Sequence, residues 1–340
     1  MTQRIKWLDT VKFFLVVRIY STHFRFSFPK GRYVYGIIMK LLTANGGISG
    51  KFCVQMFAVI LGYFATLAGE RKQEQYITKR YLYFFTCILL INSVYYCFSL
   101  IGYIKTDIAL SSVLFNAFSL AGGIYSAAWF FIHFFLGSII CYLNGRGQVN
   151  LLECILEIIA FIFLGNVWVA ACIMGSCLFN ITKEEPIINR INKWYLQLAL
   201  IIICWLILPR KESVTAYIID SIISLFLLVT CFSSNIIKRV LSVNWLSRLG
   251  QYSMEIFLIH TLVYSTLGIK SFNYISRYVN LKLSWLLTWL ICILCIIILS
   301  FPLKLIIRYL NSFMCKMMYK IYSILPKHET KAKNNDYSKE

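Results

Sequence analysis

The chain is dominated by apolar segments that are long enough to cross a lipid bilayer as helices. A transmembrane helix needs about 20 mainly apolar residues, and segments close to this length recur from Leu8 to Leu305. They do not alternate over about ten residues, as the strands of a membrane barrel do. The chain is 59% hydrophobic and 14% charged, with a mean hydropathy of +0.70, which excludes an ordinary soluble domain. The sequence predicts an all-α, polytopic transmembrane helical bundle.

We expect about ten spans and both termini in the cytoplasm. The stretch Leu151–Ile181 is either one long irregular span or two short ones. Two spans are favoured, because only an even total keeps most Lys and Arg on one side, as the positive-inside rule requires. Residues 1–310 then form one transmembrane domain, and 311–340 form a basic, partly disordered cytoplasmic tail. The expected spans are Leu8–Phe28, Ser49–Leu67, Tyr81–Leu100, Gly123–Leu143, Leu151–Leu164, Val167–Ile181, Trp194–Leu208, Ala216–Phe232, Tyr252–Ile269 and Leu283–Leu305.

The net charge of +20 does not indicate nucleic-acid binding. Most basic residues lie in short loops and in the tail, where membrane topology places them. Nearly all of the twelve cysteines lie in apolar segments, where cysteine acts as a small hydrophobic residue. Cys292 and Cys295 form a C-x-x-C in an Ile/Leu helix, for which packing is favoured over metal or redox chemistry. We therefore expect no metal.

The first span carries Asp9, Lys12, Arg18 and His23. Ionisable residues at membrane depth are costly and are functional-site candidates by default. At about 100° per residue, Lys12 and His23 lie roughly 20° apart on one helix face and roughly 16 Å apart along the axis. Asp9 lies within about 60° of Lys12, whereas Arg18 points away. The line Asp9–Lys12–His23 is either a reaction path or the polar wall of a water-filled vestibule.

Three further clusters are candidates. Lys79 and Arg80 end a basic linker; cations at a helix edge suit a phosphorylated ligand, although they also set topology. Trp129 and His133 lie in the fourth span, where a single His is commonly an interior hydrogen-bonding residue. Glu255 and His260 begin the ninth span, about 140° apart round the helix, so they do not share a face. His260 can still line the same cavity as His23.

Together these segments resemble the acyltransferase-3 family of integral-membrane O-acyltransferases. Lys12 and His23, with ten residues between them, match the family's paired basic residue and histidine. The other matching segments follow in family order: Arg4–Lys12 (Arg, then Leu-Asp and a basic residue), Gln55–Phe64 (the Phe-Phe-x-x-Ser-Gly-Tyr/Phe motif), Tyr76–Arg80 (the basic start of helix three), Ala128–Phe131 (Leu-Trp-Phe-Leu) and Leu246–His260 (Leu-Gly-x-x-Ser-x-x-Ile-Tyr-Leu-Ile-His).

The resemblance implies transfer of an acyl group, usually acetyl from acetyl-CoA, to a sugar hydroxyl of a surface or capsular polysaccharide or a lipid-linked glycan. It implies a multi-pass protein of the bacterial cytoplasmic membrane, with residues 1–310 as the acyltransferase-3-like domain. The implied catalytic residues are His23, as general base or acyl carrier, with Lys12 and Asp9. Lys12, Lys79 and Arg80 would bind acyl-CoA. The expected acceptor residues are Trp129, His133, Glu255 and His260.

Some positions depart from the family pattern. Lys12 stands where Arg is usual, Leu61 replaces Ser, and Tyr83 and Thr86 replace a second Arg and a Pro. Lys keeps the charge but not the bidentate fork of Arg. Two other functions stay open, a transporter or flippase of a polysaccharide or lipid precursor and a non-catalytic scaffold. We expect no fused extracytoplasmic esterase-like domain, so a separate glycan-biosynthesis protein would supply one if acceptor choice needs it.

Overall fold

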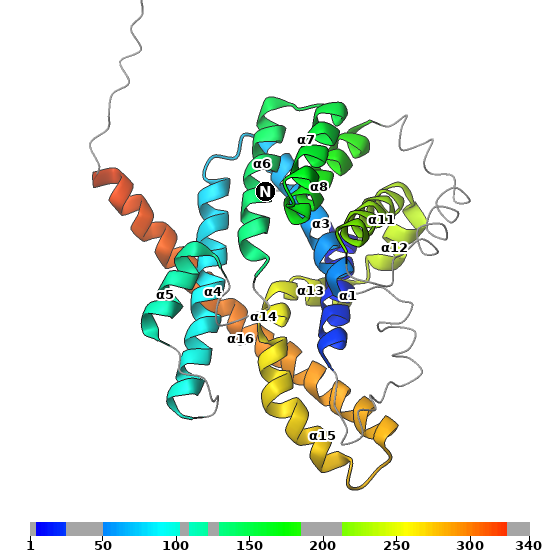
Figure 1. Cartoon of the computed structure of the whole chain (residues 1–340), viewed down its shortest axis with the longest axis vertical. Coiled ribbons are helices and arrows are strands. Elements are labelled where there is room, and N and C mark those ends of the chain that lie inside the picture. The colour runs from blue at the N-terminus through cyan, green and yellow to red at the C-terminus, as the bar shows by residue number, and fades with distance from the viewer. Residues whose placement is uncertain (1–4, 25–49, 103–108, 122–128, 185–212, 325–340) are drawn as a thin grey trace, which may run out of the picture.

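A computed structural model of the chain describes residues 5–24, 50–102, 109–121, 129–184 and 213–324 (Figure 1). These residues form helices and turns and contain no strand, which confirms the predicted all-α class. The helices are α1 Lys6–His23, α3 Gly50–Glu70, α4 Tyr76–Leu100, α5 Leu110–Ser119, α6 Phe131–Gly147, α7 Leu151–Phe163, α8 Val167–Lys183, α11 Val214–Ser233, α12 Asn235–Leu241, α13 Asn244–Gly250, α14 Ser253–Val263, the π-helical turn η2 Tyr264–Gly268, α15 Ile269–Ile275 and α16 Leu281–Ile324.

Several helix ends differ from the expected spans. Helix α4 begins at Tyr76, so the expected linker up to Arg80 is shorter. The Tyr76 ring stacks on Tyr142 at 5.6 Å, and the Tyr142 hydroxyl donates to the carbonyl of Gln73 at 3.1 Å. These contacts draw the start of α4 onto α6. The expected span Trp194–Leu208 lies outside the described residues.

The stretch 151–181 forms two helices, joined by a tight turn. Asn150 and Glu153 form a capping box at the start of α7, and the Asn166 side chain caps α8 by accepting from the backbone of Val169 at 3.2 Å. Between the helices, Gly165 has a φ of +73°, a conformation that glycine adopts without strain. The favoured division into two helical elements therefore agrees with the structure.

The last helix is much longer than the expected span Leu283–Leu305. Helix α16 has 44 residues, or about 66 Å at 1.5 Å per residue, roughly twice the hydrocarbon thickness of a bilayer. It continues through residue 310, so the helix itself does not mark the expected boundary between residues 1–310 and the tail. Residues 325–340 lie outside the described ranges.

Large apolar side chains cover the outer faces of several helices. Leu152 and Leu156 of α7 are 66% and 58% exposed, and Leu294 and Ile298 of α16 are 58% and 64% exposed. Such faces are stable in lipid and would be a liability in water. By length and composition, α3, α4, α11 and α16 can each cross a membrane. The protein is therefore a membrane protein, while the number of about ten spans and the side of the termini stay predictions.

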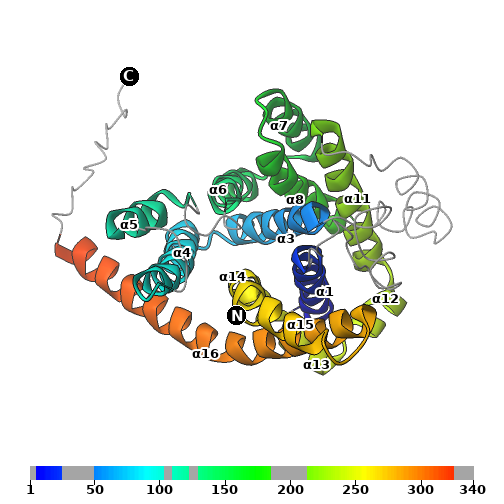
Figure 2. The same cartoon turned by 60° about the horizontal axis from the view of Figure 1, so that its bottom comes forward.

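Helix α3 packs against both α6 and α8, which also contact each other (Figure 1, Figure 2). Glycines allow the backbones to approach closely. A Cβ at Gly62 of α3 would lie 1.8 Å from the carbonyl oxygen of Cys172 on α8, and one at Gly145 of α6 would lie 2.0 Å from the carbonyl oxygen of Thr66 on α3. Small residues at such contacts are typical of membrane helices. Gly62, part of the second-span motif, therefore serves packing.

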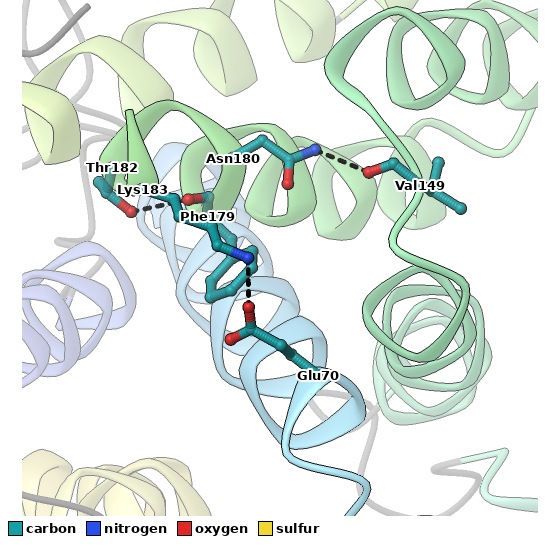
Figure 3. A network of polar contacts seen from close by, with 6 residues as sticks. All are labelled: Glu70, Val149, Phe179, Asn180, Thr182 and Lys183. Atoms are coloured by element: carbon teal, nitrogen blue, oxygen red, sulfur yellow. Dashed lines mark hydrogen bonds and ion pairs between the residues drawn. The ribbon is translucent and has the colours of Figure 1, made fainter. Parts of the chain in front are cut away.

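Polar contacts join the far ends of the same helices (Figure 3). Lys183 of α8 pairs with Glu70 of α3, and the Asn180 side chain donates to the carbonyl of Val149 at 3.0 Å. In the same turn the Thr182 hydroxyl donates to the carbonyl of Phe179 at 2.9 Å. These contacts hold the end of α8 against the C-terminal end of α3 and against the turn that follows α6.

Helices α1, α14 and α16 form a second group, and α16 crosses outside the other two (Figure 2). Trp285 of α16 donates from its indole to the carbonyl of Phe24 at 3.3 Å, and Trp289 donates to the Ser21 hydroxyl at 3.2 Å. Phe24 caps α1 directly after His23. Two tryptophans of α16 therefore hold the end of α1 that carries His23.

The close approach of α6 to α3 gives a testable prediction. We expect Gly145→Ala to lower the melting temperature of the detergent-solubilised protein by several degrees or to prevent folding, because the new Cβ would meet a backbone oxygen at 2.0 Å. Gly147→Ala is the matched control on the same helix, where the nearest atom would be the Val149 Cγ2 at 3.7 Å. Equal melting temperatures for the two variants would contradict the packing described.

Candidate functional site

Two histidines from different helices lie together at the end of α1. The ring centroids of His23, the last residue of α1, and His260 of α14 are 5.2 Å apart. His23 is exposed and His260 is fully buried. The two histidines therefore lie close together, as the sequence allowed.

The tautomer of His260 follows from its backbone contact. Its Nδ1 lies against the carbonyl oxygen of Phe257, and because a carbonyl only accepts, Nδ1 carries the proton. Nε2 is buried and has no hydrogen-bond partner among the described residues. In this tautomer Nε2 is an acceptor, so a buried acceptor lies in the ring beside His23.

Charged residues from three helices gather at the other end of the α1 face. Lys12 and Asp9 form an ion pair of 2.7 Å on α1. Glu255, at the start of α14, is only 3% exposed and interacts electrostatically with Lys12, Lys304 and Arg308, the last two from α16. We call Asp9, Lys12, Glu255, Lys304 and Arg308 the charged cluster.

Lys304 is held in place by neutral contacts as well. Its ammonium group donates to the carbonyl of Gln251 at 2.5 Å and lies 4.1 Å from the ring centroid of Tyr252. Both partners belong to the turn between α13 and α14. The cation therefore lies over the start of α14, near Glu255.

A glycine brings the α13–α14 turn against α1. A Cβ at Gly250 would lie 1.7 Å from the backbone carbonyl oxygen of Asp9, so only glycine fits there. Gly250 belongs to the Leu246–His260 segment, whose Glu255 and His260 lie near Lys12 and His23 respectively. Helices α1 and α14 therefore carry two groups of side chains at different depths. Lys12 and Glu255 belong to the ion-pair level, and His23 and His260 form the imidazole level. Along α1 the two levels are roughly 16 Å apart, at 1.5 Å per residue.

The neighbouring cations Lys79 and Arg80 do not share one environment. Lys79 is exposed, whereas Arg80 is half-buried, with its guanidinium 5.8 Å from the Tyr76 ring centroid and 5.2 Å from that of Phe84. Arg80 and Glu255 both interact electrostatically with Tyr83. The structure thus places Arg80 near the charged cluster and directs Lys79 outward.

Trp129 and His133 reach the histidine pair through a series of aromatic rings. His133 lies 6.3 Å from Trp129, which lies 5.8 Å from Phe130. Phe130 packs at 5.1 Å on Phe257, which lies 5.2 Å from His260. Trp129 and His133 therefore lie on the imidazole side of the site and do not contact His260 directly.

Sequence reasoning did not identify Lys304 or Arg308 as site residues. Lys304 and Arg308 follow the apolar part of α16, so in the sequence they resemble charges that set membrane topology. In the structure they lie near Glu255. Asp220 is buried in α11, and it and Arg18 both interact electrostatically with Cys53. Arg18 therefore faces away from the Asp9–Lys12–His23 line, as its helical position predicts.

The site combines anion-binding groups at one level with neutral imidazole chemistry at another. The charged cluster can hold phosphates, because Lys and Arg pair with phosphate oxygens. A neutral imidazole can accept a proton from a hydroxyl or carry an acyl group. Across the described ranges, no group of three or more His, Cys, Asp or Glu side chains is suited to hold a metal ion.

Comparison with protein families gives an independent result. The family model of the acyltransferase-3 domain, described as an acyltransferase domain, matches residues 5–305. Comparisons with curated proteins and with solved structures gave no match.

The electrostatic coupling in the charged cluster can be measured as stability. We expect Lys304→Met to lower the free energy of unfolding by roughly 1–3 kcal/mol, because Glu255 loses a compensating cation in a buried site. Adding Glu255→Gln should recover part of that loss, so the two changes are less than additive. Lys282→Met, at an exposed position of the same helix, should have little effect. Strict additivity would show that Lys304 and Glu255 are not coupled.

Proposed function

The chain belongs to the acyltransferase-3 family, and we propose that it is an O-acyltransferase that moves an acyl group, usually acetyl, from acyl-CoA to a sugar hydroxyl. The observation that carries this proposal is the pairing of His23 with His260 at 5.2 Å on the two helices that also carry Lys12 and Glu255. An anion-binding level and an imidazole level on one pair of helices suit a donor whose phosphates and reactive thioester are far apart.

The charged cluster is proposed to bind the phosphates of acyl-CoA. Lys12, Lys304 and Arg308 supply three cations from α1 and α16, and Arg80 adds a fourth from α4. The exposed Lys79 is proposed to attract the donor phosphates at longer range. Asp9 orients Lys12 through the 2.7 Å ion pair. The pantetheine arm then extends along α1 toward His23.

His23 is proposed to act on the acceptor hydroxyl. As general base, its imidazole takes the hydroxyl proton while the oxygen attacks the thioester carbonyl carbon. The carbon–sulfur bond breaks, and the CoA thiolate leaves and recovers the proton. As acyl carrier, His23 first receives the acyl group and then passes it to the hydroxyl. Only the carrier role leaves an acylated histidine when donor is supplied without acceptor.

His260 is proposed to position His23. Its Nδ1 is committed to the carbonyl of Phe257 and its Nε2 is a free acceptor within the described residues. A ring N–H of His23 that donates to this acceptor would leave the other ring nitrogen of His23 basic.

The proposed setting is the cytoplasmic membrane of a bacterium, with the charged cluster toward the cytoplasm and the acceptor a surface or capsular polysaccharide or its lipid-linked precursor. Coenzyme A is made inside the cell, so a charged cluster that faces the cytoplasm is on the side where the donor is available. A separate glycan-biosynthesis protein is the proposed source of any extra acceptor selectivity.

Replacing His23 tests the catalytic assignment. We expect His23→Ala to abolish acylation of the glycan, a loss of at least a hundredfold, as is typical for a general base, while membrane expression stays normal. Mass spectrometry of surface glycans would detect the loss of one acyl mass. His328→Ala, in the tail outside the described residues, is the control. Near-normal acylation by His23→Ala would refute the assignment. Movement of a glycan precursor across the membrane that needs no CoA and is unchanged in His23→Ala would instead favour a transporter.

Replacing Lys12 tests the donor site. We expect Lys12→Ala to raise the KM for acyl-CoA about tenfold or more, because one charge-assisted phosphate contact is lost. Lys12→Arg should keep activity, since it keeps the charge. A steady-state assay with purified protein in nanodiscs would separate KM from kcat. A silent Lys12→Ala would contradict donor binding by the charged cluster.

A further inference from the structure

Three aromatic residues near the starts of α6, α8 and α11 pack in series at the imidazole end of the bundle. The ring centroids of Trp129 and Trp168 are 4.7 Å apart at 72°, and those of Trp168 and Tyr217 are 5.4 Å apart at 42°. Trp129 lies in the turn just before α6, and Trp168 and Tyr217 lie in the first turns of α8 and α11. Trp129 is 38% exposed, and Trp168 is nearly buried beneath it. We call these three rings the aromatic platform.

Polar groups lie at both edges of the aromatic platform. At the Trp129 edge, the half-buried His133 has a buried Nδ1 without a hydrogen-bond partner in the described part of the chain. At the other edge, Lys51 donates to the Tyr217 hydroxyl at 2.6 Å and lies 5.1 Å from that ring centroid. Trp129 is therefore the most exposed ring of the three, and a hydrogen-bonding group lies at each edge of the set.

Two independent contacts place the aromatic platform at the end of the bundle that carries His23. The rings of Phe130 and Phe257 connect Trp129 with His260 at centroid distances between 5.1 and 5.8 Å. On the Lys51 side, a Cβ at the adjacent Gly50 would lie 2.7 Å from the Thr22 hydroxyl, one residue before His23. The charged cluster lies at the opposite end of α1.

We propose that the aromatic platform binds a pyranose ring of the acceptor glycan. One face of a pyranose presents C–H groups, which pack on the negative π-face of an aromatic ring, while its rim of hydroxyls needs hydrogen-bond partners. Trp129 supplies the exposed stacking surface, Trp168 and Tyr217 support it, and His133 and Lys51 contact the hydroxyls. The inference rests on the proposed function for the identity of the sugar as acceptor, and it adds Trp168, Tyr217 and Lys51 to the acceptor site.

The competing explanation is an interfacial belt, since Trp and Tyr gather at membrane surfaces. A belt faces lipid as separate side chains and needs no ordered contact among rings from three helices. A belt also predicts that loss of Trp129 changes membrane insertion and not sugar binding. Binding measurements separate these two explanations.

The experiment measures sugar binding without catalysis. Full-length protein with His23→Ala is placed in nanodiscs and titrated with free disaccharides of neutral hexoses, N-acetylated amino sugars and uronic acids, by saturation-transfer NMR and calorimetry. We expect at least one class to bind, roughly five- to tenfold more weakly after Trp129→Ala, and nearly unchanged after Trp129→Phe. Trp245→Ala, at a 62% exposed position on α13, is the matched control and should bind normally.

The outcomes separate this inference from the proposed function. Binding that is unchanged by Trp129→Ala, or no binding of any disaccharide to protein with an intact platform, overturns the aromatic platform and leaves only a belt. Binding that depends on Trp129 in a protein that transfers no acyl group from any acyl-CoA supports the platform and overturns the proposed function. A raised KM for the sugar in active Trp129→Ala protein, with unchanged KM for acyl-CoA, supports both.

Discussion

Compensation of buried charge is the constraint on which the arrangement of α1, α14 and α16 depends. Glu255 is almost fully buried, and a carboxylate in that position is stable only when cations and donors surround it. Lys12 comes from α1, and Lys304 and Arg308 come from α16. The same contacts that neutralise Glu255 therefore fix the register of three helices, and this register places His260 beside His23 at the other end of α1.

Close backbone contact supplies the second half of this arrangement. Gly250 allows the turn before α14 to lie on the backbone of Asp9, and Trp285 and Trp289 of α16 bind the far end of α1. Helix α1 is therefore fixed at both ends by segments more than 200 residues away in the sequence. A helix with a mixed face of Asp, Lys and His would not stay in one orientation in lipid without such contacts.

Local sequence signals predicted the helical class, the two helices of 151–181 and the orientation of Lys12, His23 and Arg18, because each depends on helix period or on capping and turn residues. They allowed His260 to lie near His23, but they did not predict that Glu255 lies beside Lys12 at the other end of α1. That result depends on how α14 packs on α1. Lys304 and Arg308 were missed for the same reason, since a basic helix end is normally explained by topology. Lys79 and Arg80, adjacent in sequence, separate because only Arg80 is drawn inward by Tyr76 and Phe84.

We propose that the charged cluster and the histidine pair serve one reaction at two depths of the membrane, roughly 16 Å apart along α1. The most direct test uses everted vesicles that expose the cytoplasmic face, with isotope-labelled acetyl-CoA outside and an acceptor disaccharide that binds the protein trapped inside. We expect labelled disaccharide in the lumen, at a rate that depends on His23. Label that reaches the sugar only when donor and acceptor are on the same side of the membrane would contradict it.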